Sequence, residues 1–277
     1  MSSQRPAPVA MDVSYRGADA WPLYAHTFGA GPAIMLLHGG GPDHRSLLPL
    51  AEQLSDASTV VLPDLRGFGR SVCTDPACFT WARYTADVIA LIDHLGLHKV
   101  SLVGTGMGST IALRVAAAHP DRVSAMALIS VEDIEDDEAK AAEVAFFEAF
   151  AARVVAGGPQ AAWGPVLPAL APLIGALVRE AIPRCDPASL AAFCAIGYDR
   201  AFRSVDELRS IDVPALVVPG DDARHPSRFA AEVARALPRG HLASACVSAE
   251  LRTADDLGEA VGPEIRRFLA AHNASSG

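Results

Sequence analysis

The chain has 277 residues, of which 51% are hydrophobic and 20% charged, and its formal net charge is -9. A chain of this size and apolar content suits one large globular domain with a full core. Nucleic acids and anionic membranes are bound chiefly through basic patches, and no such patch is visible, so both are excluded as expected partners. We therefore expect a small-molecule ligand.

The N-terminal segment and the cysteines favour a cytoplasmic protein with reduced thiols. Residues 1–17 lack the apolar stretch of a signal peptide, and five irregularly spaced cysteines do not resemble a disulfide framework. Cys73 and Cys78 are too far apart for a CxxC pair, so we expect no metal and no cofactor. The most apolar stretch, 163–178, is too short to span a membrane and contains three prolines, which suits pocket or lid surface. The sequence does not determine the oligomeric state, and a homodimer is one of the alternatives.

Strand-like and helix-like segments alternate along most of the chain. Two strand-like segments at the N-terminus predict a hairpin, and the short apolar runs that follow alternate with helical patterns. This alternation indicates a mostly parallel sheet with helices on both faces. We expect strands at 9–15, 23–28, 33–38, 59–62, 100–103, 123–130, 214–218 and 242–247, and helices at 44–54, 81–95, 109–119, 227–237 and 255–272.

Residues 131–211 depart from this alternation. They are rich in Ala, Glu and Leu at helical spacing and contain no convincing strand. We predict that they form a helical lid, inserted into a core domain made of residues 1–130 and 212–277. The lid begins with the acidic run 132–137, which we interpret as a solvated helix start from which Glu132 or Asp133 can reach the pocket.

The segment Val-Gly-Thr-Gly-Met-Gly-Ser at 103–109 has the small-residue frame of a strand-to-helix turn that exposes a nucleophilic serine. Gly106 stands where that serine would be. Thr105 and Ser109 flank the turn without occupying its tip, and we interpret both as capping or packing hydroxyls. A dinucleotide-binding fingerprint needs a different glycine spacing on the first strand-to-helix turn of the sheet, so that reading is disfavoured.

Together with LLHGGGPD, LPDLRGFGRS and PALVVPGDD, this turn resembles the α/β-hydrolase fold family in its lid-bearing branch. The resemblance runs from about residue 10 to residue 270. It implies a mostly parallel, twisted sheet flanked by helices, with a lid. It also implies an oxyanion hole that uses the backbone N–H groups of Gly40 and Met107.

The same resemblance leaves the catalytic triad incomplete. Asp222 matches the triad acid, but the triad histidine is expected near residues 249–251, and none of these is histidine. His241 precedes the last expected strand, and we interpret it as a surface histidine. Asp222 and His225 are close enough in sequence to form an acid–base pair for lyase-, isomerase- or cyclase-like chemistry. The alternative is a polar turn at a helix start.

Further polar residues surround the expected oxyanion loop, at the sheet edge where open parallel sheets bind ligands. We take His38 as a further catalytic candidate and Asp43, His44 and Arg45 as substrate-binding candidates. Removal of the serine side chain at Gly106 also leaves room beneath the oxyanion donors for a water molecule or a ligand atom.

Three functions remain open. The first is an enzyme that acts on a small, largely apolar carbonyl compound, such as an ester, lactone or polyketide-like molecule, without a serine nucleophile. The second is a non-catalytic ligand-binding protein that keeps the fold. The third is a Ser-to-Gly variant of an ordinary esterase or lactonase, which the additional lack of a triad histidine disfavours.

Overall fold

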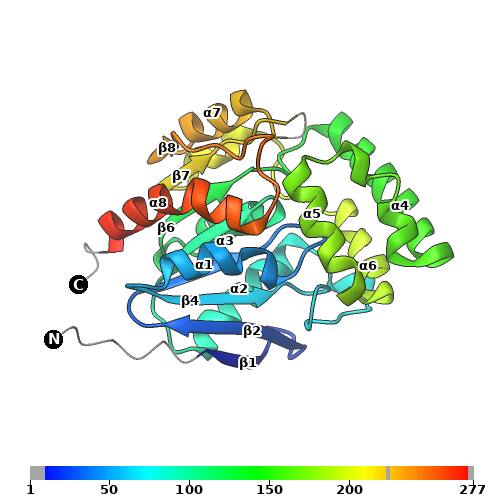
Figure 1. Cartoon of the computed structure of the whole chain (residues 1–277), viewed down its shortest axis with the longest axis horizontal. Coiled ribbons are helices and arrows are strands. Elements are labelled where there is room, and N and C mark those ends of the chain that lie inside the picture. The colour runs from blue at the N-terminus through cyan, green and yellow to red at the C-terminus, as the bar shows by residue number, and fades with distance from the viewer. Residues whose placement is uncertain (1–9, 223–224, 274–277) are drawn as a thin grey trace.

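A single twisted sheet forms the middle layer of the molecule in a computed structural model that describes residues 10–222 and 225–273 (Figure 1). The strand order is β1-β2-β4-β3-β5-β6-β7-β8. The first two strands form an antiparallel hairpin that pairs with β4, and the remaining strands run parallel to one another. The strands are β1 (Met11–Arg16), β2 (Pro22–Gly29), β3 (Ala33–Leu37), β4 (Thr59–Asp64), β5 (Val100–Thr105), β6 (Val123–Ile129), β7 (Ala215–Val218) and β8 (Gly240–Leu242).

The continuously apolar central strands are buried on both faces. In β3, Ile34 and Leu36 face one part of the core, whereas Met35 and Leu37 face the other, because successive side chains of a strand point to opposite sides. Helices α1 (Leu48–Leu54) and α8 (Ala254–Asn273) cover the first face (Figure 1). The second face packs against α2 (Trp81–His94), α3 (Met107–Ala118) and α7 (Ser227–Ala236).

Three α-helices lie between β6 and β7 in the sequence, in the interval where a lid is expected. They are α4 (Asp137–Trp163), α5 (Pro172–Ala181) and α6 (Pro187–Phe193), and they gather at the carboxyl ends of the parallel strands (Figure 1). Helix α4 is kinked at Gly158, whose φ is 75°, and Pro159 follows it. Within the described ranges, no helix has both the length and the apolar character needed to cross a bilayer.

The last strand differs from its expected position. We expected a strand at 242–247, but β8 ends at Leu242, and Val247 makes only an isolated bridge to Gly220. The physical reason is a competing partner: the carboxylate of Glu264 on α8 accepts hydrogen bonds from the backbone N–H groups of Ser244 and Ala245. His241 lies in β8, where it is exposed and packs against Phe268, as a surface histidine does.

Candidate active site

Gly106 alone connects β5 to α3. Its φ of 50° and ψ of -122° form a sharp turn in a region that side-chain-bearing residues rarely adopt. Its backbone N–H donates to the carbonyl oxygen of Ile129 at 2.9 Å, which ties the turn to the end of β6. A Cβ atom on Gly104 would overlap the backbone of Gly108, so the small-residue frame is required by close packing.

Ser109 and Thr105 are not placed as nucleophiles. Ser109 is fully buried, and its hydroxyl donates to the carbonyl oxygens of Gly104 and Ile129 at 2.8 and 3.0 Å. Thr105 ends β5 and lines the cavity without occupying the tip of the turn. The contacts of Ser109 agree with the interpretation of its hydroxyl as a packing group.

The carboxylate of Glu132 lies over Gly106. The chain leaves β6 through two non-glycine residues with positive φ, Ser130 at 53° and Asp133 at 61°. Each such conformation costs on the order of 1–3 kcal/mol and is typical of functional sites. A Cβ atom on Gly106 would lie 2.8 Å from Glu132 Oε1. Glu132 therefore fills the space into which a nucleophile side chain would extend.

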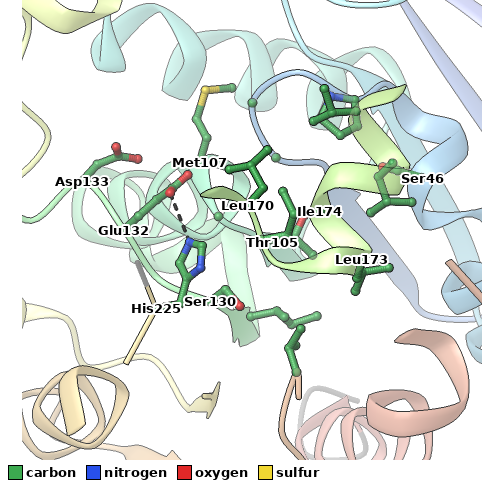
Figure 2. A pocket seen from close by; sticks show the side chains of 18 of the residues that line it. Ser46, Thr105, Met107, Ser130, Glu132, Asp133, Leu170, Leu173, Ile174 and His225 are labelled. Atoms are coloured by element: carbon green, nitrogen blue, oxygen red, sulfur yellow. Dashed lines mark hydrogen bonds and ion pairs between the residues drawn. The ribbon is translucent and has the colours of Figure 1, made fainter. Parts of the chain in front are cut away.

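His225 lies between two carboxylates. Its Nε2 is 3.3 Å from Glu132 Oε2, the contact drawn in Figure 2, and its Nδ1 is 3.0 Å from Asp222 Oδ2. The backbone N–H of His225 also donates to Asp222 Oδ1 at 2.9 Å. The structure thus brings Asp222 and His225 together. It adds Glu132, which from the sequence is expected only to be able to reach the pocket.

The two carboxyl groups influence the protonation state of His225. A neutral imidazole has one donor nitrogen and one acceptor nitrogen, whereas both nitrogens of His225 face carboxyl groups. Burial lowers the pKa of His225, but the hydrogen bonds and negative charges of Glu132 and Asp222 outweigh burial and raise the pKa above its ordinary value. The arrangement therefore favours an imidazolium held between two carboxylates.

A cavity of about 170 Å³ opens in front of this group. Most of its wall is apolar, with aromatic and aliphatic side chains from α4, α5 and α6, among them Phe146, Phe147, Trp163, Ile174 and Phe193. Among the described residues that line it, the ionisable ones are Glu132, Asp133 and His225. Figure 2 shows these three side chains on one side of the cavity and the α5 side chains on the other. A small, largely apolar ligand suits such a wall.

The two residues expected to form an oxyanion hole, Gly40 and Met107, also line the cavity. Met107 is the first residue of α3, so its N–H has no partner within the helix and lies at the positive end of the helix dipole. The loop that carries Gly40 packs beside the end of β5, since a Cβ atom on Gly39 would lie 3.4 Å from the carbonyl oxygen of Thr105. Both residues adjoin the space above Gly106.

The structure corrects the expectation that His38 is catalytic. His38 is fully buried and does not line the cavity. Its Nε2 accepts from the backbone N–H of Leu65 at 3.0 Å, and its Nδ1 lies 2.8 Å from the carbonyl oxygen of Gly39. Burial lowers the pKa of His38, which favours the neutral ring that these two contacts require. His38 therefore has a structural role, because its ring connects the loop at Gly39 and Gly40 to Leu65, the residue after β4.

Asp43, His44 and Arg45 likewise do not line the cavity, whereas Pro42 and Ser46 on either side of them do. The Asp43 carboxylate accepts from Arg184 Nε at 2.7 Å, and Arg45 points outward with about half of its side chain exposed. His44 Nδ1 lies 2.7 Å from Asp64 Oδ1. The expectation of a substrate-binding trio is therefore corrected: these polar groups neutralise one another behind the cavity wall.

Asp43, His44 and Asp64 also place three ligand-type atoms within 4.8 Å of one another. The oxygens of Asp64 are nevertheless engaged by His44 and by the backbone N–H of Arg70, and Asp43 is engaged by Arg184. This donor set fits an ion-pair network better than a metal centre.

Comparisons with known proteins agree with this architecture. The family model for the alpha/beta hydrolase fold matches residues 32–167. The chain is 32% identical over 110 residues to a 2-hydroxymuconate semialdehyde hydrolase of Pseudomonas sp. (strain CF600), and the match covers 38% of the chain and 38% of that relative's length. The chain is similar to this family and has the α/β-hydrolase fold.

Solved structures match over nearly the whole chain. An esterase from Thermogutta terrifontis has a TM-score of 0.80 and 26% identity, covering 95% of this chain and 99% of the esterase. The bottromycin epimerase BotH, determined with bottromycin A2, has a TM-score of 0.74 and 24% identity, covering 93% of this chain and 99% of the epimerase. The fold is therefore shared by proteins named for hydrolysis and by one named for epimerisation.

Proposed function

We propose that this protein is an enzyme that moves a proton beside the carbonyl group of a small, largely apolar compound, with Glu132 as the base and without a serine nucleophile. The single observation that carries the proposal is the Glu132 carboxylate over Gly106, 2.8 Å from the position that a Cβ atom would occupy. Isomerisation and epimerisation are the reaction types that such a site performs.

The two oxygens of Glu132 have different surroundings. Oε2 is held by His225 Nε2, whereas Oε1 faces the turn at Gly106. A substrate carbonyl oxygen that binds the N–H groups of Gly40 and Met107 would present its α-carbon to Oε1. The C–H proton then moves to Glu132, and the C–H electron pair forms an enolate whose oxygen is stabilised by the two N–H donors.

His225 and Asp222 position and tune the base. His225 stabilises the Glu132 carboxylate before the reaction, and Asp222 holds the ring in the required orientation through Nδ1. After enolate formation, Glu132 returns its proton to carbon. It protonates a neighbouring conjugated carbon, or, once the planar enolate has turned over in the cavity, the opposite face of the same carbon. No co-reactant is required, because atoms and electrons balance within the substrate and Glu132.

The fold comparison supports this reaction class. BotH is named an epimerase and shares the fold, so the architecture is compatible with reactions other than hydrolysis. The apolar cavity supports a substrate with little charge, and an anion is disfavoured by the Glu132 carboxylate in its wall.

Exchange of hydrogen for deuterium tests the proposal without knowledge of the natural substrate. Butyl methyl ketone in heavy water should lose its α-proton NMR signals faster with the protein than without it. We expect Glu132→Gln to reduce the enzyme-catalysed rate by at least about a hundredfold, a typical contribution of a general base. Glu138→Gln, at the exposed start of α4, is the matched control. Equal exchange rates for the Glu132→Gln and unmodified proteins would refute the proposal.

Hydrolysis is the second candidate, because the family model and the curated relative point to hydrolases. In that reaction Glu132 would activate a water molecule for attack on an ester held by the same N–H donors. Turnover of p-nitrophenyl acetate that requires Glu132, with no exchange into the ketone, would favour this candidate. Tight ligand binding with neither reaction would favour a non-catalytic binding protein.

A further inference from the structure

Asp133 is a polar group in the cavity wall that the reaction above does not use. It lines the cavity immediately after Glu132, and both side chains are labelled in Figure 2. Asp133 Oδ2 is shielded from water and has no hydrogen-bond partner among the residues that the structure describes. A buried polar atom without a partner is rare in proteins and calls for a ligand or another explanation.

The backbone places this side chain at a conformational cost. Asp133 has a φ of 61°, a conformation that aspartate and asparagine tolerate better than most residues but still rarely adopt. Strain of this kind persists where the surrounding structure holds it, and it gathers at ligand-binding sites. The strained backbone of Asp133 is therefore consistent with a role for this side chain in ligand binding.

The surroundings of Asp133 favour a neutral carboxylic acid. Burial and the nearby carboxylates of Glu132, Glu143 and Glu135 raise the pKa of Asp133 well above its ordinary value, and the Thr110 side chain opposes them only in part. The ammonium group of Lys140 is engaged by two of these carboxylates, Glu135 at 3.4 Å and Glu143. A protonated carboxyl group has an O–H to donate, which a carboxylate lacks.

We propose that Asp133 is a substrate-binding residue that donates a hydrogen bond to a second oxygen of the substrate, so that the substrate is a neutral compound with two oxygen acceptors, such as a diketone or a keto ester. The proposal rests on the proposed function in one respect: the first oxygen is the carbonyl that binds beside Gly106. The second oxygen accepts the O–H of the Asp133 carboxyl group, which lines the cavity.

Other ligand chemistries fit the cavity less well. An anionic group at this point would face Glu132 and the acidic residues around Asp133. A cationic group would pair with an ionised Asp133, and the aromatic wall would tolerate it. Cation binding would require Asp133 to lose its proton, which burial and the surrounding carboxylates oppose, so we favour the neutral oxygen acceptor.

Two flexible ketones of equal length test this inference by binding alone. Acetonylacetone has a second carbonyl, and butyl methyl ketone does not. We expect the unmodified protein to bind the diketone roughly tenfold more tightly in NMR titrations, as one hydrogen bond to an otherwise unpaired buried group provides. The preference should weaken as the pH rises and Asp133 ionises.

Two substitutions fit the backbone at this position. Asp133→Asn keeps a donor and tolerates positive φ, so it should retain most of the preference and lose its pH dependence. Asp133→Gly also tolerates positive φ but has no donor, so it should abolish the preference. Asp206→Asn, at an exposed aspartate, is the control. Thermal unfolding verifies that each variant is folded.

Three results would overturn the inference. They are equal affinities of the unmodified protein for the two ketones, a preference that survives in Asp133→Gly, and tight binding of hexylamine that Asp133→Asn abolishes, which would identify a cation site. Failure of the proposed function is seen separately, because it appears as absent deuterium exchange while the diketone preference remains.

Discussion

Glu132 Oε2 lies 3.3 Å from His225 Nε2, although the two residues are 93 positions apart in the chain. The contact joins the loop after β6 to the loop after β7, at the carboxyl ends of two neighbouring parallel strands. It places a carboxylate over the turn at Gly106. Gly106 is the residue that leaves room for it.

Substitution of Gly106 by alanine should disable the site. The added Cβ atom would lie 2.8 Å from Glu132 Oε1, and a φ of 50° strains any residue that has a side chain. We expect a loss of about 1–3 kcal/mol in the free energy of unfolding and a large loss of α-proton exchange. Urea denaturation and exchange into butyl methyl ketone measure the two effects. Full exchange activity in Gly106→Ala would contradict the assignment of Glu132 as the base.

Gly106→Ser tests whether the chain is a disabled esterase. We expect the single variant to remain inactive towards p-nitrophenyl acetate, because Glu132 occupies the space of the serine side chain and engages His225. Glu132→Ala combined with Gly106→Ser releases His225 and is the better candidate for esterase activity. Robust activity in Gly106→Ser alone would instead support a Ser-to-Gly variant of an ordinary esterase.

The pKa of His225 should fall when either neighbouring carboxylate is removed. Both Asp222 and Glu132 raise that pKa against the effect of burial, so Asp222→Asn and Glu132→Gln should each lower it. NMR titration of the imidazole signals measures the change, with Asp221→Asn as a control. An unchanged titration in both variants would show that the contacts do not persist in solution.

The raised pKa of His225 also links stability to pH. The stabilisation is fully present below the unfolded-state pKa of about 6.5 and is lost as the pH rises through the higher folded-state pKa. The free energy of unfolding of the unmodified protein, relative to that of His225→Gln, should therefore be larger at acidic pH and fall as the pH becomes alkaline. Urea denaturation at several pH values provides the measurement, and a pH-independent difference would refute the raised pKa.

His38 should matter for stability and not for proton transfer. His38→Ala removes the acceptor of the Leu65 N–H and leaves a buried donor unpaired, at a cost of about 1–3 kcal/mol. We expect a lower melting temperature in calorimetry. Below the melting temperature, the rate of α-proton exchange should depend on pH in the same way in His38→Ala as in the unmodified protein. A changed pH profile would return His38 to the list of catalytic residues.

Local patterns in the sequence were sufficient to predict the α/β architecture. Apolar runs ending in glycine-rich loops predict buried parallel strands, and the small residues from Gly104 to Gly108 predict the tight turn, because both follow from near-neighbour sterics and burial. The absence of a nucleophile at Gly106 is likewise visible in the sequence alone. The end of β8 was predicted less well, since Glu264 competes for the backbone of the expected strand from another element.

Only the tertiary structure decided which polar groups meet. From the sequence, Glu132 belongs to an acidic run that resembles a solvated helix start, whereas the positive φ angles of Ser130 and Asp133 turn this stretch into the cavity. His38 lies in a glycine-rich loop, a position that suggests catalysis. Its ring nitrogens instead contact backbone groups of Gly39, after β3, and Leu65, after β4. Residue type and spacing determine the fold through local physics, but a site made of contacts across 93 residues depends on backbone turns and packing that no local pattern encodes.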